Sequence, residues 1–252
     1  MKCIDLNCDM GESFGAWNMG DDAAIMPLIT SANVAAGFHA GDPGTIRETV
    51  RLAVEHGVSV GAHPSLPDLA GFGRRAMKVS AREVYDLVLY QSGAVAAFVR
   101  AAGMKLHHVK PHGALYNMAA KDVALADAIA GAVKDLGDET LLYGLAGSAM
   151  VSAARRHGVR AIEEVFADRT YQPDGSLTPR DQPGAMIIDE SAAVDQVLSM
   201  IEKGTVRSRA GQDVPVTAGT LCLHGDQPGA VAFARALRSA LADHGIAVAS
   251  PV

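Results

Sequence analysis

The segment that decides the fold covers residues 32–64, ANVAAGFHAGDPGTIRETVRLAVEHGVSVGAHP. It begins with an apolar, strand-like run over 32–37 and ends with a second run over 58–62. Between them lies an amphipathic helical pattern with apolar residues at Ile46, Val50, Ala53 and Val54. A strand, a helix and another strand in this order predict a parallel pair joined by a right-handed crossover.

The same alternation continues along the chain. A capping box of Ser80 and Glu83 precedes a long apolar stripe, and a shorter stripe covers 194–201. The remaining predicted strands cover 3–8, 106–110, 140–143, 159–166 and 220–223. About seven such units fit a TIM-like (β/α) barrel of parallel strands, one short of the usual eight. An open doubly wound sheet is the alternative, although no Gly-rich dinucleotide loop follows the first strand.

Two segments fall outside the repeating pattern. Residues 168–183 contain three prolines and a glycine and are predicted to form a long loop, and residues 205–215 are predicted to form an extra hairpin. No linker or low-complexity tract separates these segments from the rest. We therefore expect one barrel domain over residues 1–252.

Composition excludes several classes of protein. The 252 residues carry a formal charge of −6, with 49% hydrophobic and 20% charged residues, which is too apolar for a disordered chain. The acidic balance favours binding to neither nucleic acid nor anionic membranes. No signal-like segment opens the chain, no membrane-spanning run is present, and the three cysteines form no CxxC pair. These features predict a protein of the reducing cytoplasm.

Nine histidines are the most informative residue type. His56, His157 and His244 each end a helical pattern and precede glycine, which predicts helix C-termini. Four others follow predicted strands beside glycine or proline: His39, His63, His112 and His224. The C-terminal strand ends of a barrel meet at one mouth, where active sites lie. One such histidine alone indicates a turn residue held by backbone carbonyls, but four at equivalent positions favour a functional site.

Charged residues at the same strand ends extend this candidate site. Lys110 shares a strand face with His108 and His112, and Pro111 stiffens the segment, which suits the binding of a carboxylate or phosphate. Asp9 and Glu12 follow the first strand and are candidates for a general base, a metal ligand or a hydrogen-bond anchor. We place Asp9 among the catalytic candidates and Glu12 among the substrate-binding ones.

Four further charged residues have both structural and functional interpretations. Asp5 lies within the first strand and is expected to be a buried structural acid. Arg169 opens the long loop and is a candidate for clamping an anionic substrate. Asp42 and Asp226 are candidate substrate-binding residues, but each precedes a proline, so helix N-capping explains them equally well.

A divalent metal site is chemically open. Zn²⁺, Mn²⁺ or Fe²⁺ could bind Asp9 together with strand-end histidines chosen from His39, His63, His112 and His224. The spacing of these residues is not diagnostic of a metal site, because the sequence contains no H-E-x-x-H pair. The sequence gives little support to a nucleophilic serine or to a Walker-type nucleotide site. Residues 11–15 match G-x-S-x-G but lack the required strand–turn–helix setting, and no Walker loop is present.

Several blocks resemble one known family. They are DLNCDMGESFG (5–15), SANVAAGFHAGDP (31–43), GAHP (61–64), GFGRR (71–75), VKPHGALYN (109–117), EVFADR (164–169) and HGD (224–226). Together they are similar to the LamB/YcsF family of bacterial 5-oxoprolinase subunits. The resemblance implies a barrel related to the glycoside hydrolase and polysaccharide deacetylase barrels. It also implies the role of the A subunit in a complex with two partners, the B and C subunits, that uses ATP to hydrolyse the lactam of 5-oxoproline to glutamate.

The resemblance suggests separate chemical roles for the residues of the site. Phosphorylation of the amide oxygen by ATP would create a leaving group and an electrophilic carbon. We hypothesise that Lys110 and Arg169 stabilise carboxylate or phosphate oxygens, and that Asp9 with His39 or His112 activates water. His63 and His224 would orient the ring or donate to the leaving nitrogen. Two alternatives stay open, namely a metal-dependent deacetylase and a non-catalytic subunit that binds substrate or organises its partners.

Overall fold

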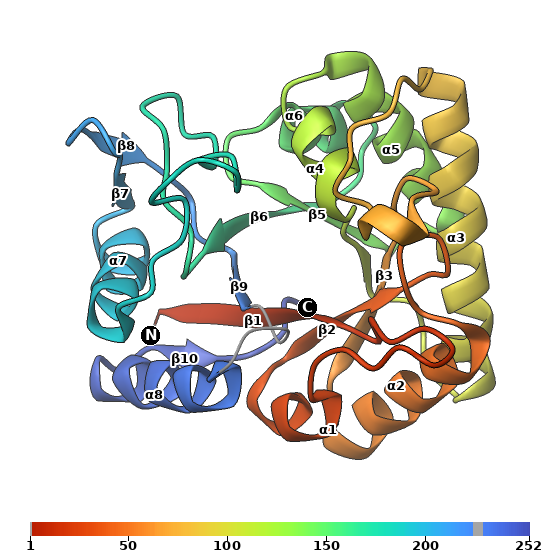
Figure 1. The fold of residues 1–252 in the computed structure, drawn as a ribbon, viewed down its shortest axis with the longest axis horizontal. Coiled ribbons are helices and arrows are strands. Elements are labelled where there is room, and N and C mark those ends of the chain that lie inside the picture. The colour runs from red at the N-terminus through yellow and green to blue at the C-terminus, as the bar shows by residue number, and fades with distance from the viewer. Residues whose placement is uncertain (1, 224–228) are drawn as a thin grey trace.

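Seven parallel strands close into a barrel in the computed structural model, which describes residues 2–223 and 229–252 (Figure 1). In order around the barrel they are β1 (Cys3–Met10), β2 (Ser31–Ala35), β3 (Ser59–His63), β4 (His108–Val109), β5 (Leu141–Leu145), β6 (Ala161–Phe166) and β9 (Thr220–Leu223). The last strand closes the ring because β9 pairs with both β6 and β1. The predicted barrel of about seven strands is therefore confirmed, and the open sheet is excluded.

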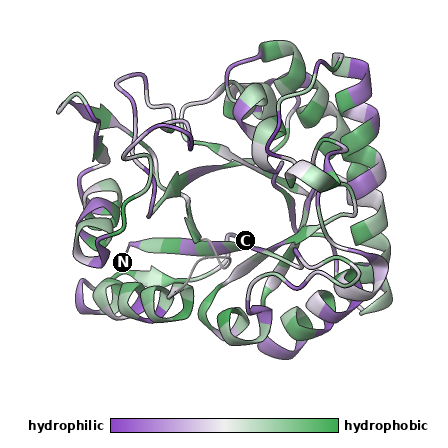
Figure 2. Ribbon diagram, in the orientation of Figure 1, coloured by the Kyte–Doolittle hydropathy of each residue, from purple (hydrophilic) through white to green (hydrophobic). Residues whose placement is uncertain are grey.

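Helices between the strands cover the outside of the barrel. They are α1 (Asp22–Ile25), α2 (Pro43–His56), α3 (Ala81–Ala101), α4 (Gly113–Ala119), α5 (Val123–Leu136), α6 (Ala149–Arg156), α7 (Glu190–Glu202) and α8 (Ala230–Asp243), with 3₁₀ turns at Met26–Leu28 and Leu69–Gly71. These helices carry both hydrophobic and hydrophilic residues, as amphipathic packing requires (Figure 2). Helix α3 begins at the predicted capping box of Ser80 and Glu83. His56, His157 and His244 all lie at helix C-termini, as predicted.

The fourth strand is shorter than expected. The prediction covered 106–110, whereas β4 contains only His108 and Val109. The His107 and Lys110 amides still donate to Val60 O and Ala62 O of β3, at 2.8 and 3.0 Å. Pro111 has no amide hydrogen with which to continue this ladder.

Three features lie outside the barrel wall. The predicted hairpin exists as β7 (Thr205–Arg207) paired antiparallel with β8 (Asp213–Pro215). The predicted long loop between β6 and α7 contains turns and isolated bridges. A short strand that was not predicted, β10 (Ala247–Val248), adds to the edge of β1. Within the described residues, no helix combines the length and the apolar character needed to cross a membrane.

The inside of the barrel is polar. Alternation along β1 turns Asp5, Asn7 and Asp9 toward one face, and Asp5 is 1% exposed. The Asp5 carboxylate accepts hydrogen bonds from the hydroxyls of Thr30, Ser31, Tyr143 and Thr220 at 2.6–2.9 Å. These four donors fulfil the expectation that Asp5 is a structural acid. They also show that the strands carry hydrophilic side chains into the interior.

Candidate active site

A cavity of about 610 Å³ lies at the C-terminal mouth of the barrel. Its lining includes three acids, Asp9, Glu12 and Asp181, and two imidazoles, His63 and His112. It also includes five cationic side chains, those of Arg74, Lys110, Lys121, Arg169 and Arg180. Volumes of about 300–1,000 Å³ are typical of small-molecule sites, and the excess of cations suits an anionic ligand. The mouth predicted from the strand-end residues is therefore a real cavity.

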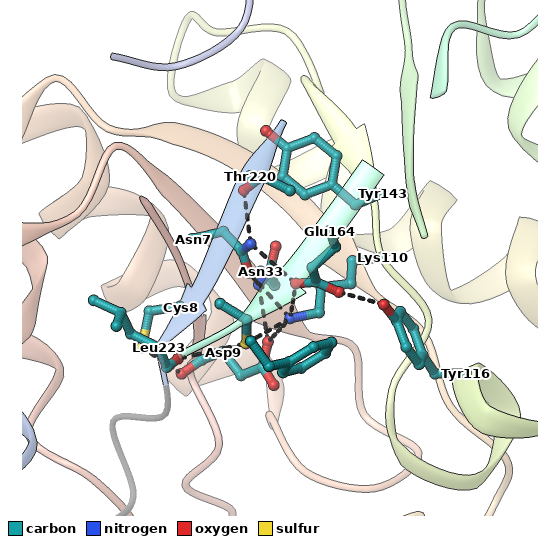
Figure 3. Close-up of polar contacts among 12 residues, drawn as sticks. Asn7, Cys8, Asp9, Asn33, Lys110, Tyr116, Tyr143, Glu164, Thr220 and Leu223 are labelled. Carbon is teal, nitrogen blue, oxygen red and sulfur yellow. Dashed lines mark hydrogen bonds and ion pairs between the residues drawn. The ribbon is translucent and has the colours of Figure 1, made fainter. Parts of the chain in front are cut away.

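Lys110 is the central cation of the site (Figure 3). Its side chain is 3% exposed, and its Nζ lies 2.7 Å from Glu164 Oε1 and 3.0 Å from Asp9 Oδ1. It also donates to Asn7 Oδ1 at 3.0 Å. Burial alone would lower the pKa of Lys110, but the neighbouring Asp9 and Glu164 charges outweigh burial and raise this pKa well above its usual value. Lys110 is therefore a permanently charged group and not a proton donor at neutral pH.

Glu164 on β6 is a site residue that the sequence reasoning missed. It is fully buried and accepts hydrogen bonds from Tyr116 Oη at 2.6 Å and from Asn7 Nδ2 at 3.0 Å (Figure 3). The preceding Glu163 instead contacts Arg155, a largely exposed residue, at 2.9 Å. Two adjacent acids in an apolar strand were the available signal, because alternation places one of them inside the barrel.

Three of the four strand-end histidines meet at the mouth. The His39 and His112 rings stack with centroids 3.8 Å apart, and His63 packs edge-on against both. His39 reaches this position through a tight turn after β2. Glycine is required in that turn at Gly41, where φ is +81° and a Cβ would lie 2.4 Å from Ala35 O.

Backbone carbonyls fix the orientation of two of these rings. His63 Nδ1 donates to Lys110 O at 2.6 Å, and His112 Nε2 donates to Phe72 O at 2.9 Å. The other two ring nitrogens, His63 Nε2 and His112 Nδ1, lie 2.9 Å apart. Asp9 Oδ2 is 3.2 Å from His63 Nε2. Burial lowers the pKa values of His39 and His112 well below their usual value, with a further contribution from neighbouring imidazoles.

Glu12 adds a carboxylate to the imidazoles. Its Oε1 lies 3.5 Å from His39 Nε2 and 3.6 Å from His112 Nδ1. One potential ligand atom from each of Glu12, His39, His63 and His112 lies within 4.8 Å of the others. These four side chains could hold a metal ion. The sequence reasoning had grouped Asp9 with the histidines and placed Glu12 among the substrate-binding residues.

Arg169 contributes a buried guanidinium to the cavity from the loop after β6. It is 4% exposed, and its Nη2 donates to Thr178 O at 2.5 Å. Within the part of the chain that the structure describes, its buried Nε has no hydrogen-bond partner. Burial, reinforced by the charge of Arg180, lowers the pKa of Arg169 to about 10. A buried guanidinium that lines a cavity is well suited to an anionic ligand.

The other predicted site residues lie elsewhere or are not described. Asp42 caps α2 by accepting from the amides of Gly44 and Thr45, and it accepts from Gly15 N at 2.8 Å. The described cavity lining does not include Asp42, so its N-capping role is confirmed. His224 and Asp226 lie outside the described residues. The G-x-S-x-G match over 11–15 forms a loop, consistent with its low weight.

Comparison with known proteins identifies the family. The family model for LamB/YcsF matches residues 4–252. The chain belongs to the LamB/YcsF family. The resemblance seen in the sequence blocks is thereby confirmed.

Several LamB/YcsF relatives align over nearly their full length. The 5-oxoprolinase A subunit of Bordetella parapertussis is 62% identical over 245 residues, which are 97% of each chain. The protein of the same name from Tolumonas auensis is 58% identical over 248 residues, covering 98% of this chain and 99% of that one. The crystal structure of a lactam utilization protein from Thermus thermophilus has a TM-score of 0.93 and 50% identity, with both chains fully covered.

Proposed function

We propose that this chain is the A subunit of an ATP-dependent 5-oxoprolinase and that it binds and opens the lactam ring of 5-oxoproline. The observation that carries this proposal is the cavity at the barrel mouth, where Asp9 and the imidazoles of His63 and His112 share the lining with the buried cations Lys110 and Arg169. The names of the LamB/YcsF relatives support it. Two partners, the B and C subunits, complete the complex. We place the complex in the cytoplasm, in agreement with three cysteines that form no disulfide.

The chemistry requires activation of a resonance-stabilised amide. The γ-phosphoryl group of ATP passes to the ring carbonyl oxygen, and water then adds to the ring carbon. The carbon–nitrogen bond breaks as the nitrogen takes up a proton, which leaves an acyl phosphate. A second water releases phosphate and yields glutamate. The cavity of about 610 Å³ exceeds what a single five-membered ring acid occupies, which leaves room for the phosphoryl group.

Individual roles follow from the positions of the side chains. Arg169 binds the substrate carboxylate, because it presents a buried guanidinium to the cavity. Lys110 stabilises negative charge on the carbonyl or phosphoryl oxygen as a fixed cation. Asp9 is the base that activates water, and His63, 3.2 Å away, is its imidazole partner. This assignment replaces His39 or His112 as the partner of Asp9.

The test is reconstitution of the complex with the B and C subunits. We expect 5-oxoproline-dependent ATP hydrolysis and glutamate release only when all three proteins are present. Asp9→Asn should reduce turnover by at least about 100-fold, the scale of a lost general base. Asp127→Asn, at a partly exposed ion pair between α5 and α6 and outside the cavity lining, is the matched control and should retain turnover.

Four results would contradict the proposal. Full turnover with Asp9→Asn would remove the catalytic role of this site. Turnover without this chain would make it dispensable, and turnover by this chain alone would exclude a requirement for the partners. Full turnover after substitution of the strand-end histidines would favour an organising role instead.

A further inference from the structure

We propose that Glu12, His39, His63 and His112 form a binding site for one divalent transition-metal ion, with Zn²⁺ the best-matched ion. The four side chains come from the ends of four consecutive strands, β1 to β4. The proposal concerns metal binding by this chain, so it does not depend on which substrate the cavity accepts.

The first argument is a count of hydrogen-bond donors. His63 Nδ1 and His112 Nε2 both donate to backbone carbonyls, so the remaining nitrogen of each neutral ring carries a lone pair. These two lone pairs face each other across 2.9 Å. Asp9 Oδ2 and Glu12 Oε1 approach the same point at 3.2 Å from His63 and 3.6 Å from His112. Four acceptors therefore converge, and such an arrangement needs a cation between them.

The second argument distinguishes a metal ion from an extra proton. The nitrogen atoms of His39, a residue only 1% exposed, form no hydrogen bond with any described residue, although Nε2 is 3.5 Å from Glu12. A proton shared by His63 and His112 would leave this third imidazole unused. A metal ion would engage all three rings and the carboxylate together.

The ligand spacing and ligand type indicate the class of metal. Four ligands placed about 2.0–2.1 Å from Zn²⁺ in a tetrahedron lie about 3.3 Å from one another. The separations among the four side chains include 2.9, 3.5 and 3.6 Å, and one potential ligand atom of each lies within 4.8 Å of the others. Three imidazoles with one carboxylate suit Zn²⁺, Co²⁺ or Fe²⁺, whereas Mg²⁺ and Ca²⁺ prefer oxygen ligands.

The surroundings of the rings match those of known metal sites. Metal-binding histidines donate their second ring N–H to a carbonyl or carboxylate, which fixes the ring orientation. His63 and His112 both do so, and the carbonyl that holds His63 belongs to Lys110. The backbone carbonyl of Lys110 thus orients a proposed metal ligand, while the side chain of Lys110 supplies a cation to the same cavity.

The test measures metal binding by the full chain without ATP, substrate or partner proteins. After treatment with a chelator, titration with Zn²⁺ in a calorimeter should show one equivalent bound with micromolar or better affinity. Replacing a ligand should cost more than the about 10–100-fold that loss of an outer partner costs. We therefore expect His39→Gln and Glu12→Gln each to weaken binding by at least about 100-fold.

Two controls keep the result specific. His157→Gln, at an exposed helix end, and Cys3→Ser, which removes the exposed thiol, should bind Zn²⁺ like the wild type. Circular dichroism should show that all variants remain folded. Co²⁺ should give the visible absorption of a four-coordinate ion in the wild type and not in His39→Gln.

The proposal is overturned if the metal-free wild type binds no stoichiometric Zn²⁺ or Co²⁺, or if both ligand variants bind as the wild type does. An imidazolium signal of His63 or His112 in NMR spectra of such a protein would identify a shared proton instead. Neither result would alter the reconstitution experiment, so failure of the metal site and failure of the proposed function are distinguishable.

Discussion

Lys110 neutralises two carboxylates within the barrel, and this sets the cost of removing it. Lys110→Met leaves Asp9 and Glu164 close together without their cation. Breaking a buried ion pair in this way typically costs about 3–5 kcal/mol. We expect that loss in the free energy of unfolding, measured by urea denaturation, together with loss of 5-oxoproline-dependent turnover in the complex.

A second substitution separates stability from activity at this position. Adding Glu164→Gln to Lys110→Met removes one of the two uncompensated charges, so part of the lost stability should return. Turnover should not return, because the cation is still absent. A double variant no more stable than Lys110→Met would show that the two side chains are not coupled.

We expect Arg169 to lower the stability of the fold while it contributes to substrate binding. Because burial lowers its pKa to about 10, the folded state holds the charged guanidinium less favourably than the unfolded chain does. At pH 7 Arg169→Met should therefore leave the free energy of unfolding unchanged or raise it by about 1–4 kcal/mol. The substrate KM of the complex should rise strongly. Marked destabilisation with an unchanged KM would contradict the assignment of Arg169 to the substrate carboxylate.

At the scale of elements, β3 and β4 pack closely enough to require glycine at one position. A Cβ at Gly61 would lie 2.2 Å from Nε2 of the buried His108 ring. Gly61→Ala should cost about 1–3 kcal/mol through overpacking. Gly93→Ala, on the exposed face of α3 with no atom near the new methyl group, should instead stabilise by about 0.5–1 kcal/mol. Thermal unfolding of both variants tests this difference in sign.

The strand–helix alternation predicted the elements well because each element has its own local pattern. Helix caps at Asp42 and Ser80 and the glycines after helices mark boundaries in the sequence itself. The predicted length of β4 was wrong, because strand pairing depends on the backbone groups of the neighbouring strand and not only on the local sequence. The strand β10 was missed because two residues carry no periodic signal.

The candidate site was predicted where position along a strand was sufficient. Strand ends placed Asp9, His63, Lys110 and His112 at one mouth, and the structure places all four on the cavity lining. Glu164 was missed because its partners, Lys110 and Tyr116, come from other elements. The relation of Glu12 to the imidazoles also depends on how loops after different strands meet, which no local pattern encodes.

At the scale of the whole molecule, the proposed metal site would link four neighbouring strands. An ion bound only by the folded state stabilises it by about 4.1 kcal/mol when its concentration is about 1,000 times the Kd. For a chain of this size, each kcal/mol raises Tm by about 2–4 °C. Saturating Zn²⁺ should therefore raise Tm by about 8–16 °C in the wild type. It should have little effect in His39→Gln, as scanning calorimetry can show.

The floor of the barrel lies opposite the mouth and involves the end of the chain. Ser250 Oγ donates to Ser59 Oγ at 2.8 Å, and Pro251 O accepts from His107 Nε2 at 2.8 Å. Val252 is fully exposed. Removal of residues 250–252 would therefore let solvent reach the hydroxyls around Asp5, one of which, Ser31 Oγ, lies 3.5 Å from Ser250 Oγ. For protein engineering, this short segment closes one end of the barrel and should be kept.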